Sequence, residues 1–166
     1  KIRPTLDQLP VRRYKNRSKT LFSPAWLPFS SVVEKINKIN PEIAHLQWIA
    51  GGMLRIADIG KIKAPIVWSL QDMWAFTGGC HYNEDCKAYE KECGNCKVLG
   101  SIKENDLSYK IFNRKLKVFA NKKDMIIVGI SRWINECSTN SSLLKDKKHI
   151  NLPNPIDTSM FKPFDK

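Results

Sequence analysis

The chain has 166 residues, 42% of them hydrophobic and 10% aromatic, which excludes an intrinsically disordered chain and fits one globular domain with its own core. No run of apolar residues approaches the roughly 18–20 that a membrane span needs, and the first residues lack the apolar centre of a signal peptide. The formal net charge of +12 indicates a solvated basic surface or an anionic partner.

The positive charge is concentrated at the start of the chain. Residues 1–20 hold seven Lys and Arg against Asp7 alone, a net of +6 (7 − 1) and half of the total. Residues 1–29 show neither helical nor strand periodicity, so we predict an irregular basic arm. Such an arm is either a solvated tail or a contact for nucleic acid, anionic lipid head groups or an anionic substrate.

Two helices and two strands are predicted next. Ser31 and Glu34 have the spacing of a capping box, so a helix begins at Ser30 or Ser31 and ends before Pro41. The pattern predicts a strand over 43–49, a turn at the following glycines, a helix over 53–62 and a strand over 65–70. The last strand is almost continuously apolar, which is typical of a strand buried on both faces.

The second half of the chain repeats this alternation. A helix is predicted over 107–119, with an apolar stripe and a charged face that includes Lys115. A buried strand over 125–130, a helix capped by Ser131 and a short strand over 150–152 follow. The alternation predicts an α/β, Rossmann-like domain over 30–152, with a parallel sheet, helices on both faces and a cysteine-rich insert at 80–96. Residues 153–166 are predicted to be a linker.

Residues 69–82 are the first candidate site. They follow a predicted buried strand, and ligands of such sheets bind beyond the carboxyl ends of the strands. The segment combines Gln71 and Asp72 with aromatic rings and a Gly-Gly pair. Rings beside hydrogen-bonding groups suit a sugar, whose C–H faces pack on rings. The alternative is a packed loop in which the aspartate is satisfied internally.

Four cysteines within a short span form the second candidate site. Cys80, Cys86, Cys93 and Cys96 include one C-x2-C pair, a common half of a tetrahedral zinc site, and four thiolates would leave no open position for catalysis. His81 and Cys137 are alternative ligands. Two disulfides and four free thiols remain the other interpretations.

Residues 67–82 resemble a segment of the bacterial family 4 glycosyltransferases that build capsule or exopolysaccharide. Cys86, residues 93–96, residues 43–52 and residues 152–157 also resemble that subgroup. The resemblance implies a GT-B enzyme of two Rossmann-like domains that retains anomeric configuration without a catalytic metal. This chain corresponds to its N-terminal, acceptor-side domain, whereas the nucleotide-sugar is bound mainly by the other domain. Nothing before Ser30 has the pattern of the family's first strand and glycine-rich loop, so we expect the chain alone to be inactive.

The resemblance also assigns residues. Relatives usually have His-Asp where this chain has Gln71-Asp72, and glutamine cannot carry a proton as histidine does. The expected catalytic pair is Gln71 and Asp72. The expected acceptor-binding residues are Trp48, Gly51, Gly52, Trp74, Phe76, Thr77, Gly78, Gly79 and His81, and the expected interdomain hinge is Asn154, Pro155 and Asp157.

The resemblance implies a cytoplasmic enzyme with a glycan or lipid-linked acceptor, and the basic arm adds peripheral contact with an anionic inner membrane as an option. Two other interpretations stay open. One is a zinc-stabilised nucleic-acid-binding module, which the charge and the cysteines favour. It is disfavoured because the aromatic residues lie away from the basic arm. The other is a sugar-binding remnant without transferase activity, which Gln71 favours.

Overall fold

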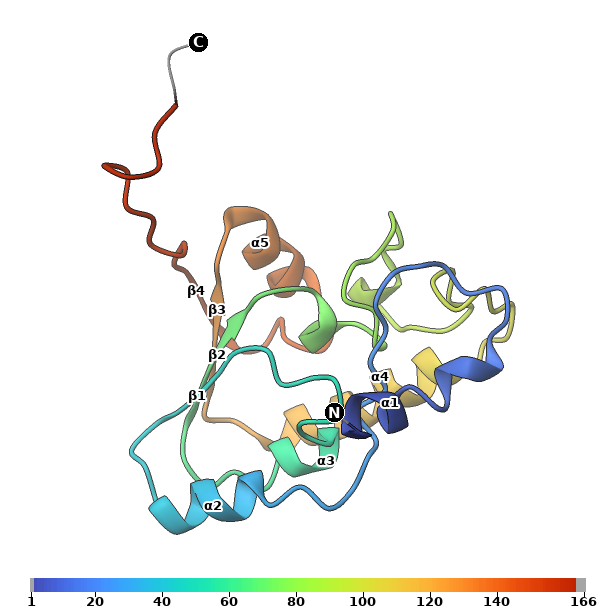
Figure 1. Cartoon of the computed structure of the whole chain (residues 1–166), viewed down its shortest axis with the longest axis horizontal. Coiled ribbons are helices and arrows are strands. Elements are labelled where there is room, and N and C mark those ends of the chain that lie inside the picture. Colours follow the sequence, from blue (N-terminus) through green and yellow to red (C-terminus); the bar gives the residue numbers. More distant parts are fainter. Residues whose placement is uncertain (1, 164–166) are drawn as a thin grey trace.

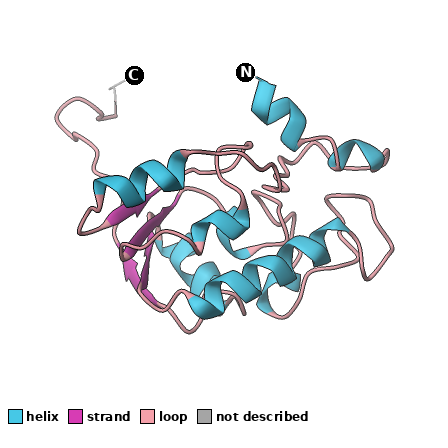
Figure 2. Cartoon of the chain, turned by 90° about the horizontal axis from the view of Figure 1, so that it is seen from below, coloured by secondary structure: helices cyan, strands magenta, loops and turns pink. Residues whose placement is uncertain are grey.

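The computed structural model describes residues 2–163, and its centre is one parallel β-sheet (Figures 1 and 2). The four strands lie in the order β1-β2-β3-β4, and each neighbouring pair is parallel. The predicted α/β class with a parallel sheet is therefore confirmed. The strands are β1 (Ala44–Leu46), β2 (Ile66–Leu70), β3 (Met125–Gly129) and β4 (Lys148–Asn151).

The helices follow the predicted alternation, with differences in length. The predicted helix over 53–62 is reduced to the four residues of α3. Two short 3-10 helices, η2 and η3, lie in the long connection between β2 and α4. The helical elements are α1 (Ile2–Asp7), η1 (Val11–Arg13), α2 (Val32–Ile39), α3 (Ile56–Ile59), η2 (Trp74–Phe76), η3 (Ala88–Glu90), α4 (Leu107–Asn121) and α5 (Arg132–Asn140).

Side-chain caps begin the two long helices. The Asp106 side chain accepts a hydrogen bond from the backbone N–H of Tyr109 in α4, and Ser131 caps α5 as predicted. The capping box predicted for α2 is wrong, because the Ser31 side chain makes no cap hydrogen bond. Ser30 lies closer to that role, since its hydroxyl accepts from the Val32 N–H at 3.4 Å.

One face of the sheet is covered by both long helices. Phe119 of α4 packs edge-on against Trp68 of β2, with ring centroids 5.9 Å apart. Gly129 of β3 is so close to α5 that a Cβ there would lie 2.7 Å from the Asn135 Cα. Trp68 and Gly129 belong to the same sheet face, because Gly129 pairs with Leu70, two residues after Trp68.

Helices were predicted on both faces of the sheet, but the two long helices, α4 and α5, lie on the same face. Each strand is added on the same side of the previous one, and right-handed crossovers then place successive helices on one face. On the opposite face His45 is exposed, Val67 and Ser69 are half-buried, and the His45 Nε2 lies 2.8 Å from the Ser69 Oγ. Strand β2 is thus fully buried on one face only, although its apolar run predicts two.

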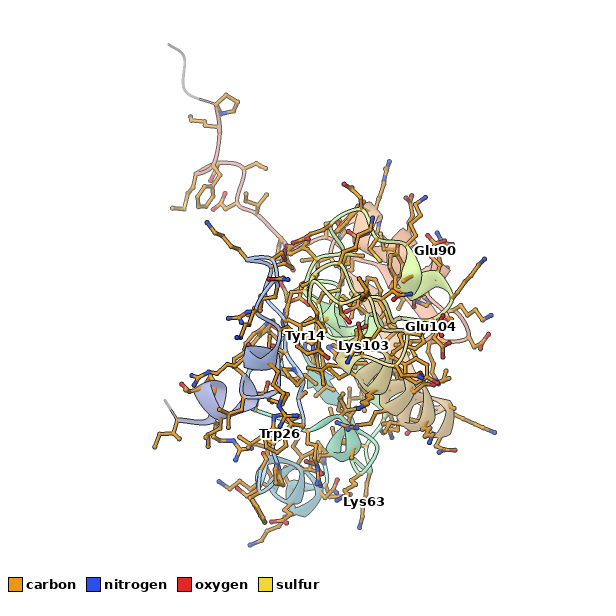
Figure 3. The ribbon with its side chains drawn as sticks, turned by 90° about the vertical axis from the view of Figure 1, so that its right-hand side faces the viewer. Tyr14, Trp26, Lys63, Glu90, Lys103 and Glu104 are labelled. Atoms are coloured by element: carbon orange, nitrogen blue, oxygen red, sulfur yellow. The ribbon has the colours of Figure 1, made fainter. Side chains whose placement is uncertain are left out.

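The N-terminal segment is folded onto the domain, which corrects the prediction of an irregular arm. It begins with α1, and the Asp7 side chain is fully buried. The Ser23 N–H donates to the Gly79 carbonyl at 2.8 Å, and the His81 N–H donates to the Leu21 carbonyl at 2.9 Å. Further along, the Tyr14 hydroxyl accepts from the backbone N–H at the start of α4 (Figure 3). These partners are distant in sequence, so local periodicity does not reveal them.

Beyond β4 the chain leaves the body of the domain (Figure 1). Residues 151–163 are exposed throughout. Within the described residues, 2–163, no helix has the length and apolar character needed to cross a bilayer.

Candidate functional site

The loop after β2 begins at the carboxyl edge of the sheet, where the sequence predicts the site. Asp72 lies at its start, and its Oδ1 accepts a hydrogen bond from the Trp74 N–H at 2.8 Å. This bond begins the η2 turn. The Trp74 indole N–H in turn donates to the Ser23 carbonyl at 2.8 Å, so the loop is tied to the N-terminal segment.

Asp72 is the first member of a buried chain of three polar side chains. Its Oδ2 lies 2.6 Å from the Nδ1 of His81, and the His81 Nε2 lies 2.9 Å from the Ser23 Oγ. A carboxylate only accepts, so Nδ1 carries the proton, and in the neutral ring Nε2 accepts from the serine hydroxyl. Both ring nitrogens are therefore occupied inside the protein.

The same order of Asp, His and Ser occurs in hydrolases, in which the serine attacks the substrate. Here Ser23 is 1% exposed and His81 is 2% exposed. A nucleophile must reach its substrate, and this hydroxyl faces the interior. The arrangement therefore positions Asp72, whose side chain keeps 15% of its surface exposed.

Four of the predicted site residues meet at one place. Trp48, Gln71, Asp72 and Trp74 line a cavity of about 10 Å³ beyond the carboxyl ends of β1 and β2. This volume holds roughly one water molecule, so a sugar ring would lie over the cavity mouth rather than inside it. Trp48 is 47% exposed and offers an accessible ring face beside the half-buried Gln71 and the edge of Asp72.

Other predicted acceptor-binding residues are inside the protein. Trp74, Phe76, Thr77 and His81 are all buried, so their side chains do not reach an acceptor from these positions. Phe76 packs edge-on against Tyr89 at 5.4 Å, and the Thr77 hydroxyl donates to the Cys80 carbonyl at 2.6 Å. These residues build the loop, while the groups that face solvent lie at its start.

The predicted glycines serve close packing. Gly79 has φ 122°, and a Cβ there would lie 2.7 Å from the Phe22 ring. Gly52 has φ 77°, and its Cβ would lie 2.8 Å from the Arg3 carbonyl oxygen. Gly78 meets the Ser108 carbonyl, and Gly51 meets the Trp48 ring. The space beside each glycine is thus filled by the protein itself.

A buried lysine of α4 binds two carbonyl oxygens of the same loop. Lys115 of α4 is fully buried, and its Nζ donates to the Trp74 carbonyl and, at 3.0 Å, to the Thr77 carbonyl. The Nζ also lies 3.8 Å from the centre of the Trp74 ring. Burial lowers the pKa of Lys115 to about 7, against the opposing effect of nearby Cys80 and Cys93. The sequence prediction of an exposed Lys115 is wrong.

The four clustered cysteines surround a second cavity, of about 20 Å³, and all are free thiols. Burial raises the pKa of Cys80 and of Cys93 to about 12 each, so both thiols are protonated at neutral pH. Cys137, the fifth cysteine, does not line this cavity. Among residues 2–163 no three Cys, His, Asp or Glu side chains already stand in the arrangement of a metal site.

The expected hinge lies apart from these groups. Asn154, Pro155 and Asp157 are exposed, in the extended segment after β4. The Asp157 carboxylate accepts from the Ser159 N–H at 2.9 Å and from its hydroxyl at 2.6 Å. Within the described part of the chain, this local turn contains the only side-chain hydrogen bonds of the three residues.

Ser23 and Lys115 are the site residues that sequence reasoning missed. Lys115 lies at helical spacing from Ile111, Phe112 and Phe119, all buried, so its position in the repeat indicates the interior although its charge indicates the surface. Ser23 has no such signal, because its partners come from a loop 51 and 58 positions away.

Comparison of this chain with protein-family models, with curated proteins and with solved structures finds no match in any of the three.

Proposed function

We propose that this chain is the acceptor-side domain of a retaining family 4 glycosyltransferase, which moves a sugar from a nucleotide-sugar to a glycan or lipid-linked acceptor. The observation that carries the proposal is the position of residues 67–82. This segment, which carries the resemblance, runs from β2 into the following loop and brings Gln71 and Asp72 to the carboxyl edge of a parallel sheet.

The exposed groups at this edge fit a sugar hydroxyl and a sugar ring. Asp72 is held by two hydrogen bonds, from His81 and from the Trp74 N–H, so its orientation is fixed before a ligand binds. Its exposed edge accepts a hydroxyl hydrogen bond. The Trp48 ring supplies an apolar surface for C–H faces, and Gln71 supplies one donor and one acceptor group.

Gln71 takes the place of a histidine in relatives, so it does not supply a charge or a proton to the reaction. In this proposal Gln71 binds the transferred sugar through its amide, and the buried His81 acts only on the orientation of Asp72. The domain that binds the nucleotide-sugar is supplied by the complete enzyme.

The test measures nucleoside diphosphate release by the complete enzyme with a panel of nucleotide-sugars and a membrane extract as the source of acceptor. We expect release with one donor, reduced at least 100-fold by Asp72→Asn. Asp146→Asn, the same change at an exposed aspartate that does not line the cavity, is the matched control and is expected to leave the rate unchanged.

Two outcomes contradict the proposal. No release with any donor, from either the wild-type enzyme or Gln71→His, excludes a transferase and favours a sugar-binding or nucleic-acid-binding module. Release that appears only in Gln71→His identifies a degenerate transferase, in which the domain has kept the fold but lost the reaction.

A surface of the N-terminal segment favours contact with an anionic membrane. Ile2, Leu6 and Leu9 follow helical spacing, and all three are exposed. Lys15, Arg17 and Lys19 line an open cavity of about 500 Å³ nearby in sequence. Exposed apolar side chains and cations within one segment are the combination that binds an anionic lipid surface, with about 1 kcal/mol for each Lys or Arg near the surface.

Sedimentation with vesicles tests this contact. We expect binding to phosphatidylserine-containing vesicles that falls steeply with salt, and no binding to neutral vesicles. Changing Lys15, Arg17 and Lys19 together to Ala reduces it, whereas changing Lys35, Lys38 and Lys145, which are equally exposed, leaves most of it. Absent vesicle binding combined with a gel shift of mixed DNA and RNA at moderate salt overturns the membrane assignment.

A further inference from the structure

The cysteine cavity combines ligands from two loops at one point. Cys93 and Cys96 come from one tight turn, while Cys80 and Cys86 come from the end of the loop that carries Asp72. All four line the same cavity, and none is bonded to another. Four thiols around a common centre, with one C-x2-C pair, form the ligand set of a structural zinc site.

The size of the cavity suits an ion. Its volume of about 20 Å³ exceeds the roughly 10–15 Å³ that one water molecule requires and falls far below the volume of a small-molecule site. A cavity of this size is too small for an organic ligand, and it is lined by several polarisable sulfur atoms.

A hydrogen-bond donor already points at one of the sulfur atoms. The Gly78 N–H donates to the Cys93 Sγ at 3.2 Å. Such a donor favours the thiolate form, which is the form that binds a metal.

A buried lysine without an ion pair lies beside the cavity. Lys115 binds carbonyl oxygens and a ring, and no carboxylate of residues 2–163 forms an ion pair with it. It lies near enough to Cys80 and Cys93 for a charge on either sulfur to interact with its own, as the Asp72 carboxylate does. A zinc ion with four thiolates has a net charge of −2 and would supply a further countercharge.

We propose that Cys80, Cys86, Cys93 and Cys96 bind one structural Zn²⁺, and that the zinc tetrathiolate and Lys115 together hold the loop that carries Asp72 and His81. Binding converts four thiols to thiolates and releases four protons to solvent, and no electron is transferred. Zinc would be held by the four sulfur atoms, which would have to come together at the Zn–S distance of about 2.3 Å. The inference is independent of the transferase activity.

Metal content and Co²⁺ titration of the chain test the site. We expect about one zinc per chain, and Co²⁺ added to the metal-free protein should give the absorption bands of tetrahedral thiolate coordination. Cys93→Ser with Cys96→Ser abolishes both signals. Cys137→Ser, which removes the cysteine outside the cavity, leaves both unchanged. Because the Co²⁺ bands are measured on the wild-type chain, the test does not depend on the folding of the double variant.

Three results overturn the site. They are a chain from zinc-supplemented medium that is metal-free and gives no Co²⁺ bands, an intact mass that indicates two disulfides, and loss of metal in Cys137→Ser equal to that in the double variant.

The role of Lys115 has a separate test. Zinc should raise the Tm of the wild-type chain more than that of Lys115→Met, because the variant has no cation for the tetrathiolate to stabilise. Lys110→Met, an exposed lysine on the same helix, is the control and should show the wild-type shift. Equal zinc-induced shifts in all three proteins overturn the coupling while leaving the zinc site itself intact.

Discussion

Two halves of this molecule differ in regular structure. The sheet half, β1 to β4 with α4 and α5, has an apolar core in which Trp68, Phe119 and Ile127 are fully buried. The loop half, residues 71–106 with residues 2–31, has few regular elements and adds its own apolar side chains to the same core. It also buries the polar side chains that hold the Asp72 loop in place, among them Ser23 and His81.

The contrast indicates which half positions the candidate functional groups. Apolar burial is non-directional and tolerates many sequences, whereas a buried polar group requires a specific partner at a specific distance. The loop half therefore fixes the orientation of Asp72 through hydrogen bonds, and the sheet half supplies the stability that this arrangement uses.

The largest expected loss of stability comes from a substitution in the sheet half. Trp68→Ala removes a buried indole between Phe119 and Trp74 and leaves a cavity, so we expect a loss of about 3–5 kcal/mol in the free energy of unfolding. Urea denaturation measures it. Trp133→Ala, at a half-exposed tryptophan, is the control and should cost less than about 1 kcal/mol. Equal losses in the two variants contradict the assignment of the core.

A second variant breaks the loop half alone. His81→Leu leaves the Asp72 and Ser23 side chains without their partner, which costs about 1–3 kcal/mol. Hydrogen exchange should accelerate at the Ser23 amide, which pairs with Gly79, and stay unchanged in β3. His45→Leu, at an exposed histidine, is the control. Equal acceleration in β3 would mean that the two halves unfold together.

The sheet half is also the half that sequence reasoning predicts. The four strands and the helices between them follow from hydrophobic periodicity, which each segment carries within itself. Besides the length of α3 and the cap of α2, the errors there concern which faces of the sheet are buried. The apolar run of β2 indicates burial on two faces, yet the one-directional strand order leaves Val67 and Ser69 half-buried.

For the loop half, the sequence predicted which residues contribute to the site but not which of them contact one another. Asp72 and Gln71 were identified and meet Trp48, from the segment after β1, at one cavity, because their positions after strands already define the sheet edge. The links from His81 to Ser23 and from Lys115 to the Thr77 carbonyl join segments 58 and 38 residues apart. No local pattern encodes such pairs, so the hydrogen-bond partners of these side chains appear only in three dimensions.

A buried carboxylate makes the loop half sensitive to pH. Burial raises the pKa of Asp7, against hydrogen bonds from the Ala25 and Trp26 N–H groups and the charge of Arg3. A raised pKa means that the folded state holds its proton more tightly. The stability contribution of Asp7 is thus complete below the ordinary aspartate pKa and is lost as pH rises through the folded value.

The difference in unfolding free energy between the wild type and Asp7→Asn, followed by urea denaturation from acid to neutral pH, measures this effect. We expect the wild type to lose stability relative to the variant as pH rises. Glu42→Gln, at an exposed carboxylate, is the control and should show no such trend. A relative gain of wild-type stability with rising pH contradicts the predicted sign.

The smallest expected effect has the opposite sign and involves the ion pair of α3. Asp58 lies 2.8 Å from Arg55 and 3.4 Å from Lys61. Burial alone raises its pKa, but the hydrogen bonds and charges of these two cations outweigh burial and lower it. Its contribution is therefore present above the ordinary aspartate pKa and is lost as pH falls through the folded value. Because Arg55 and Lys61 are partly exposed, Asp58→Asn should cost less than about 1 kcal/mol at neutral pH. The cost should shrink in high salt, and a salt-independent loss would mean that Asp58 acts through the geometry of its hydrogen bonds with Arg55 rather than through net charge.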